Sequence, residues 1–276
     1  MMKFYTWFRP ELHTFDYAKR VIQAGIDGFE VVSWESYFAP EVYREYLANI
    51  RRIKEELNVG FSVHAPITDL HLGSLNSKVR EISLQEMKAS IELAREIGAS
   101  VVTMHAAPGI LAMPPGKWSK EEYHLPRTSG NFARQEQLVV RAVQDLADSA
   151  PDLLIGLENL VYPHELYRSP EELQDLIHQV NRSNVGLTLD VGHAVVAGQR
   201  PTDFMNLLFD DLFHIHLHDN HGVVDEHLPL GQGSIDYIGV VSTLKKLDYQ
   251  GVVNFEFRMD NPDDYRELVN QFKNLE

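Results

Sequence analysis

Apolar runs of strand length alternate with amphipathic segments of helix length eight times along the chain. Apolar residues at every second position favour strands, whereas spacings of three and four favour helices. The strands are expected at residues 3–7, 28–33, 60–64, 100–105, 153–158, 185–190, 212–218 and 252–257. The helices are expected near residues 14–24, 41–57, 77–97, 133–149, 170–180, 203–209, 234–247 and 262–274.

Eight consecutive strand–helix units predict an α/β fold: a single (β/α)8 TIM barrel with its active site at the carboxyl ends of the strands. An open doubly wound sheet is the alternative. That fold would place a glycine-rich phosphate loop after the first strand, but residues 8–11 read FRPE. Because such barrels have about 250 residues, we expect the 276 residues to form one domain, 1–276.

One long insertion interrupts the repeating pattern. Residues 106–132 are rich in proline and glycine and carry Trp118 and Tyr123. A loop of this length is either a lid over the site or an inert excursion. We expect a lid.

Composition excludes several classes of protein. The chain has no cysteine, which rules out a disulfide scaffold, a thiolate metal site and a cysteine nucleophile. The net charge of −15 counts against broad nucleic-acid binding. The uncharged stretch 98–116 contains a histidine and three prolines, so no membrane span is expected. The first residues lack an apolar run of signal-peptide length, which favours a cytoplasmic protein.

Side chains that can bind metal lie at the ends of six consecutive strands. The third and fourth strands end at His64 and His105, and the fifth ends at Glu158. The last three contribute Asp190 with His193 just beyond it, then His214, His216 and His218, and finally Glu256. In a barrel the carboxyl ends of the strands meet at one face, where catalytic groups gather.

The strand period of two indicates that these groups face the barrel axis. In the sixth strand, Leu187 and Leu189 oppose Asp190, and in the seventh, alternate apolar residues oppose the three histidines. Converging carboxylates and imidazoles would be unstable without a cation. Imidazole and carboxylate ligands suit Zn, Mn, Fe or Co, so the sequence predicts a bound divalent ion.

The loop after the seventh strand adds two more candidate ligands. Asp225 and His227 are two residues apart, a spacing that suits one further metal. The alternative is that they only hold the loop in place. Gly231 and Gly233 permit a tight return into the next helix.

Seven motifs together carry a resemblance that covers nearly the whole chain: FSVHAP, VVTMHAAPG, GLENL, LTLDVGHA, HIHLHD, VDEHLPLGQGSID and VNFEFR. In this order and at strand ends, they resemble the xylose isomerase-like TIM-barrel superfamily. That group joins sugar and sugar-phosphate isomerases and epimerases to the endonuclease IV-type abasic-site endonucleases, also called AP endonuclease family 2.

The isomerases and epimerases of this group hold one divalent ion on the fifth to eighth strands. The resemblance implies that Glu158, Asp190, His216 and Glu256 are the ligands here, and that Glu158 and Glu256 form the catalytic proton-transfer pair. This chemistry is physically consistent, because a cation that polarises a carbonyl acidifies the neighbouring C–H, and a carboxylate can remove that proton.

The endonuclease IV-like members bind three zinc ions through nine ligands. The resemblance implies that all nine positions have suitable residues here: His64, His105, Glu158, Asp190, His193, His216, Asp225, His227 and Glu256. Phosphodiester hydrolysis is therefore the alternative function. The loops at 34–40 and 65–76 contain no Lys or Arg to hold DNA phosphates, which favours the isomerase or epimerase.

We expect one to three ions per chain, zinc or manganese first, and a small sugar as partner; nucleic acid is not expected, and a homo-oligomer is compatible with the sequence. Trp7, Trp34 and Tyr37 are expected to wall a sugar ring, with core packing as the alternative. The arginines could anchor a phosphate or hydroxyl, or form surface ion pairs: Arg9, Arg200 and Arg258. Three residues are expected to support ligands rather than bind the ion: His214, His218 and Asp219.

Overall fold

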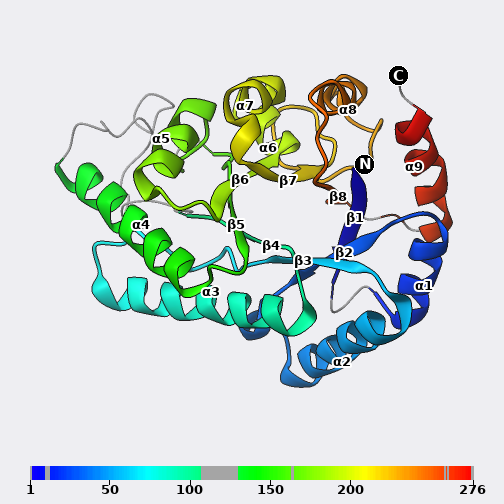
Figure 1. Ribbon diagram of the computed structural model, residues 1–276, viewed down its shortest axis with the longest axis horizontal. Coiled ribbons are helices and arrows are strands. Elements are labelled where there is room, and N and C mark those ends of the chain that lie inside the picture. The colour runs from blue at the N-terminus through cyan, green and yellow to red at the C-terminus, as the bar shows by residue number, and fades with distance from the viewer. Residues whose placement is uncertain are drawn as a thin grey trace.

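The computed structural model describes residues 2–9, 13–106, 130–162, 165–257, 259 and 261–274. Its centre is a closed barrel of eight parallel strands that pair in chain order, with the last strand against the first (Figure 1). The predicted fold class is confirmed. The strands are β1 (Lys3–Phe8), β2 (Gly28–Val32), β3 (Gly60–His64), β4 (Val101–Met104), β5 (Leu154–Glu158), β6 (Val185–Asp190), β7 (Leu212–Leu217) and β8 (Val252–Phe255).

Helices surround the barrel and cover the outward faces of its strands (Figure 1). Local signals set their ends: the Asn76 side chain accepts from the N–H of Lys78 at one end of α3, and Gly98 takes a left-handed conformation at the other. The α-helices are α1 (Phe15–Gln23), α2 (Pro40–Leu57), α3 (Ser77–Ile97), α4 (Gly130–Ser149), α5 (Pro170–Val180), α6 (Val191–Val196), α7 (Pro201–Leu208), α8 (Tyr237–Lys246) and α9 (Tyr265–Asn274). Short 3-10 helices span Glu35–Tyr37, Phe209–Asp211 and Pro262–Asp264.

The sequence analysis missed α6, which follows β6 without a break. The Asp190 carboxylate accepts a hydrogen bond from the N–H of His193 at 2.6 Å and so caps this helix. One residue thus ends a strand and starts a helix. Six residues are too few for an amphipathic period to be recognised.

The interior of the barrel is polar, whereas TIM barrels are usually filled with branched apolar residues. Leu187 and Leu189 are buried on the outward side, as expected. The side chains at the interior positions are fully buried, and some of them hydrogen-bond to one another. Thr103 Oγ1, for example, lies 3.0 Å from Thr188 Oγ1. The others are Glu30, Ser62, His214 and Asn254.

Tyr5 fills the end of the barrel at which the strands begin. It pairs with Gly28, the first residue of β2, which in turn pairs with Gly60, the first residue of β3. A Cβ atom at either glycine would overlap with the ring or the phenol oxygen of Tyr5. The two glycines therefore provide the space for one large ring.

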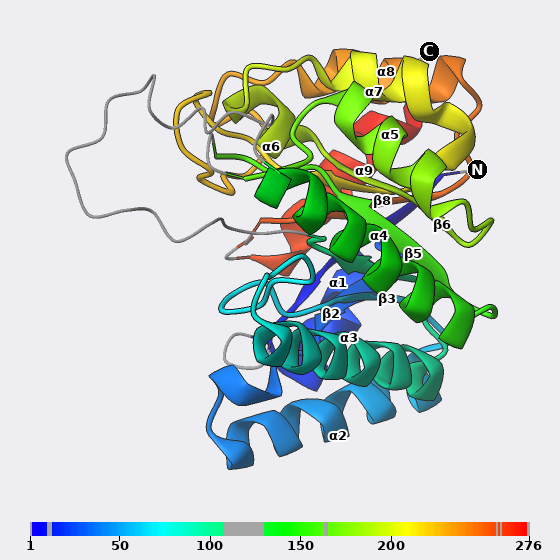
Figure 2. The same ribbon diagram turned by 90° about the vertical axis from the view of Figure 1, so that its left-hand side faces the viewer.

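The loops that follow β3 and β7 both lie at the opposite end, on the left of Figure 2. The expected lid at 106–132 falls almost entirely outside the described residues. Among the helices in the described part of the chain, none is both long and apolar enough to cross a lipid bilayer.

Candidate metal centre

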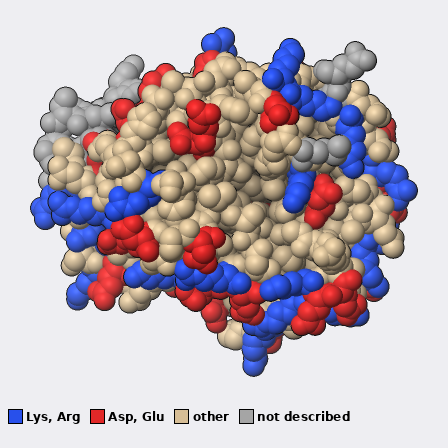
Figure 3. Space-filling view, viewed as in Figure 1, with Lys and Arg blue, Asp and Glu red and all other residues tan. Residues whose placement is uncertain are grey.

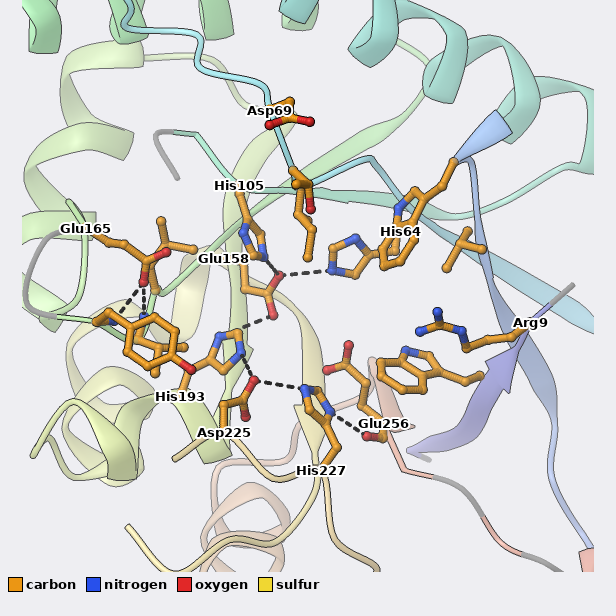
Figure 4. A pocket seen from close by; sticks show the side chains of 18 residues that line it. Arg9, His64, Asp69, His105, Glu158, Glu165, His193, Asp225, His227 and Glu256 are labelled. Carbon is orange, nitrogen blue, oxygen red and sulfur yellow. Dashed lines mark hydrogen bonds and ion pairs between the residues drawn. The ribbon is translucent and has the colours of Figure 1, made fainter. Parts of the chain in front are cut away.

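A cavity of about 560 Å³ opens at the carboxyl ends of the strands (Figure 4). Most of the residues predicted at the strand ends line it. His64 ends β3 and Glu158 ends β5. His105 follows β4, and Glu256 follows β8. The remaining predicted ligands on its wall are His193, Asp225 and His227.

Glu158 is the centre of the first cluster. Its Oε2 lies 3.2 Å from Nε2 of His64 and 2.8 Å from Nε2 of His105, and its Oε1 lies 2.9 Å from Nδ1 of His216. The carboxylate is 2% exposed, so three imidazoles surround it away from solvent. Each of its oxygen atoms is placed where a cation could replace a proton on the facing nitrogen.

His216 links Glu158 to the other two carboxylates. Its Nδ1 lies 2.9 Å from Oε2 of Glu256 and 3.8 Å from Oδ2 of Asp190. One ligand atom from each of these four residues lies within 4.8 Å of the others. The set that the resemblance implied for a single ion is therefore together in space.

A second cluster combines α6 with the segment that follows β7. Oδ2 of Asp225 lies 2.9 Å from Nε2 of His227 and 3.3 Å from Nε2 of His193. His218 joins them, since its Nε2 lies 3.4 Å from Oδ1 of Asp225. His218, which was expected to support a ligand, lies about as close to this carboxylate as His193 does. Figure 4 shows the chain of contacts from Glu158 through His193 and Asp225 to His227.

The chemistry of both clusters fits a divalent cation. Three carboxylate oxygens are buried without a hydrogen-bond partner among the described residues: Asp190 Oδ2, Asp225 Oδ1 and Glu256 Oε2. Each lies within 4 Å of an imidazole nitrogen but makes no hydrogen bond of good geometry with it, and buried anionic oxygens without such bonds are costly. Carboxylate oxygen and imidazole nitrogen are the ligands that zinc and manganese accept, and a cation would satisfy these oxygens.

The local electrostatics also suit a cation. Burial would raise the pKa of Glu158, but His216 and His105 hold it well below its ordinary value. Burial would lower the pKa of His216, but Glu256, Glu30 and Glu158 hold it well above its ordinary value. The buried carboxylates thus create a strongly negative environment, which is what a divalent cation requires.

Sequence analysis missed Glu30, which is fully buried in the middle of β2 beneath the clusters. Its Oε1 lies 3.0 Å from Nε2 of His216, and its Oε2 lies 3.0 Å from Nε2 of His214. The available signal was a lone carboxylate on the inward-facing register of an otherwise apolar strand.

Asp219 has a structural role that the sequence analysis did not predict. We expected it to orient a metal-bound histidine, but its carboxylate accepts four backbone hydrogen bonds at 2.9–3.0 Å. The donors are the N–H groups of Asn220, Gly231, Gly233 and Ile235. Asp219 therefore fastens the loop that carries Asp225 and His227. Its backbone carbonyl oxygen also lies 3.4 Å from Nδ1 of His218, so the expectation that it orients a histidine stays a prediction.

Two of the three expected aromatic residues line the cavity. The ring of Trp7 stacks on His227 with centroids 5.0 Å apart, and Trp34 meets His64 edge-on at 5.9 Å. The Arg9 guanidinium lies 5.1 Å from the centroid of each indole ring. Tyr37 is not one of the residues that line the cavity. It packs against Trp34 and donates a hydrogen bond to the carbonyl of Thr68, and both of these residues do line it.

Of the other two arginines, Arg200 lies on the surface, where its side chain is 80% exposed and pairs with Asp203. Of the two roles expected for Arg200, a ligand anchor or a surface ion pair, the structure shows the ion pair. Arg258 lies outside the described residues.

Comparison with known proteins agrees with this architecture. An uncharacterised protein of Methanocaldococcus jannaschii is 32% identical over 253 residues, which cover 90% of this chain and 80% of that one. The crystal structure of a D-tagatose 3-epimerase-like protein superposes with a TM-score of 0.77 at 26% identity, covering 99% and 97% of the two chains. D-allulose 3-epimerase from Methylomonas, crystallised with D-allulose, has the same fold, with a TM-score of 0.73 at 17% identity over 100% and 97% of the chains.

A sequence profile matches residues 18–275, and its description is the xylose isomerase-like TIM barrel. The match covers all the strands from β2 to β8 and every residue of both clusters. The resemblance in the seven motifs is thereby confirmed. The chain belongs to the xylose isomerase-like TIM barrel family.

Proposed function

We propose that the chain is a divalent-metal-dependent isomerase or epimerase of a sugar or sugar phosphate. The observation that carries the proposal is the convergence of two carboxylates on one imidazole. An oxygen of Glu158 and an oxygen of Glu256 each lie 2.9 Å from Nδ1 of His216, and both residues line the cavity. Two carboxylates at one point of a substrate cavity are what proton removal and return require.

The chain's own residues divide the chemistry between them. One of Glu158 and Glu256 removes the proton from the carbon beside a sugar carbonyl, and the other returns a proton to the substrate. Asp190 and His216 complete the ligand set with these two glutamates. When bound, the cation supplies charge stabilisation for the developing negative oxygen. The histidines around Glu158 limit the movement of its side chain, which favours a fixed position for the base.

The walls of the cavity suit a sugar. Trp7 and Trp34 offer flat apolar surfaces to the C–H faces of a ring, and the guanidinium of Arg9 between them carries donors for hydroxyl or phosphate oxygens. The similarity to a D-tagatose 3-epimerase-like protein supports the same substrate class.

Deuterium uptake from heavy water tests the proposal without a guess about the product. The metal-loaded protein is incubated with a panel of ketoses and their phosphates. We expect uptake into at least one of them, and a fall of about 10²–10⁴-fold in Glu158→Gln and in Glu256→Gln. Asp203→Asn is the matched control, because that carboxylate lies on the surface and pairs with Arg200. Unchanged uptake in both glutamine variants would refute the assigned roles.

Phosphodiester hydrolysis is a second candidate, favoured by the second cluster. Three of its residues, His193, Asp225 and His227, bring the set to the nine positions implied for a trinuclear site. The ligand atoms of the second cluster also lie within 4.8 Å of one another. Against it stand the net charge of −15 and the absence of Lys and Arg from the loops at 34–40 and 65–76. Figure 3 shows the end of the barrel at which the strands begin, opposite the cavity, and there too basic and acidic side chains alternate, with no basic stripe. Metal-dependent cleavage of abasic-site duplex DNA, with no deuterium uptake into any sugar, would favour this candidate.

A further inference from the structure

Glu30 is a buried carboxylate that does not line the cavity, yet four polar side chains surround it. Its Oε1 accepts from Nδ2 of Asn254 at 2.8 Å and lies 3.0 Å from Nε2 of His216. Its Oε2 accepts from Ser62 Oγ at 3.0 Å and from Nε2 of His214 at 3.0 Å. Glu30, His214, His216 and Asn254 are all 0% exposed.

These contacts fix Glu30 from three other strands. Ser62 belongs to β3, His214 to β7 and Asn254 to β8, whereas Glu30 belongs to β2. A carboxylate without such partners would be expelled from the barrel interior or protonated. With them, both oxygens are held in place, and one of them lies 3.0 Å from Nε2 of His216.

His216 stands between Glu30 and the proposed metal ligands. Its Nε2 faces Glu30, while its Nδ1 lies 2.9 Å from both Glu158 and Glu256. A neutral imidazole carries one proton, and the nitrogen without it offers the lone pair that binds a metal. A carboxylate facing Nε2 keeps the proton there and leaves Nδ1 free to coordinate.

We propose that Glu30 is a positioning residue: it holds the proton of His216 on Nε2 and so sets the affinity of the centre for its divalent cation. The inference rests on the proposed function only in requiring that the centre binds metal. Groups that orient a metal-bound histidine from behind change metal affinity by about 10–100-fold when they are altered.

Glu30→Gln tests the role of the charge with little change in shape. The amide oxygen can still accept from Asn254 and His216, and the amide N–H groups can donate to Ser62 Oγ and to a neutral His214. Thr103→Val is the control, because it removes another buried interior contact, Thr103 to Thr188, which involves none of the proposed ligands. Zinc affinity of the full-length chain is measured by competition with a chromophoric chelator, and the unfolding midpoint of each metal-free variant is measured alongside.

We expect Glu30→Gln to weaken zinc binding by about 10–100-fold, with Thr103→Val within about twofold of the wild type. Equal affinity of Glu30→Gln and wild type would overturn the inference, as would an equal loss in both variants. If the wild type binds no zinc, the proposed function fails as well, which separates that failure from a failure confined to Glu30.

A second measurement needs no substitution at Glu30, so it remains decisive if that variant does not fold. In the zinc-loaded wild type, nitrogen-detected NMR of the histidine rings should find the His216 proton on Nε2 and the metal on Nδ1. The signal is assigned by its loss in His216→Gln. A proton on Nδ1 or zinc on Nε2 would overturn the inference.

Discussion

Replacing Asp219 by Asn is expected to destabilise the loop that follows β7. Oδ1 accepts from the N–H groups of Asn220 and Ile235, and Oδ2 accepts from those of Gly231 and Gly233. An asparagine keeps only one acceptor oxygen. Whichever way the amide is turned, two backbone N–H groups face an NH₂ group that cannot accept from them.

The magnitude follows from that count. Asp219 is 1% exposed, so water cannot replace the lost acceptor. Leaving a buried donor unsatisfied costs about 1–3 kcal/mol, so two such donors should lower the free energy of unfolding by about 2–6 kcal/mol. Because the loop carries Asp225 and His227, ions bound by the second cluster should also be held more weakly.

Urea unfolding of the metal-free protein measures the first effect, and zinc titration measures the second. Asp203→Asn serves again as the control, since its carboxylate is partly exposed and its ion pair lies on the surface. That variant should remain within about 0.5 kcal/mol of the wild type. A loss below about 1 kcal/mol in Asp219→Asn would refute the reasoning, because it would mean that the loop can satisfy its N–H groups in another way.

Three further outcomes are expected. Gly192→Ala should lower the unfolding free energy by about 1–3 kcal/mol, because its Cβ would overlap with the ring of His218; an unchanged urea midpoint would contradict this. Removal of metal by a chelator should lower the unfolding free energy by about 2.7 kcal/mol relative to protein at a free metal concentration 100 times the Kd, and calorimetry that finds no shift would argue against a native-state site. Burial and the charge of Asp27 raise the pKa of Tyr5 to about 12; since the fold favours the neutral phenol, this stability is present below about pH 10 and is lost as the pH rises towards 12, so tyrosinate absorbance in Tyr5→Phe should lack one late-titrating group.

Much of the site could be predicted because its residues lie at strand ends. A parallel barrel brings those ends to one face whatever the helices do, so His64, Glu158 and Asp190 are placed by topology alone. The strand period then fixes which side of each strand faces the axis. Neither step requires knowledge of how side chains pack.

Glu30 and Asp219 needed information that is absent from local sequence. The position of Glu30 depends on hydrogen bonds with His214, 184 residues away, and with Asn254, 224 residues away. The role of Asp219 depends on the path by which the loop returns to donate its N–H groups, and that path is set by contacts within the folded loop. A sequence motif shows which side chains are present, but it does not show which of them a buried carboxylate contacts. That depends on which distant strands become neighbours in the folded barrel.

The pairing of β8 with β1 also has a consequence for how the molecule folds. Thr6 donates a hydrogen bond to the carbonyl of Phe255, 249 residues later. Glu30 likewise accepts a hydrogen bond from Asn254, which belongs to the same last strand. Contacts over such separations form slowly, because a long loop must close before they are made. Glu256, which follows β8, arrives in the same step. A partly folded chain therefore holds an incomplete set of ligands, and the appearance of tight metal binding during refolding would mark the moment at which the ring of strands closes.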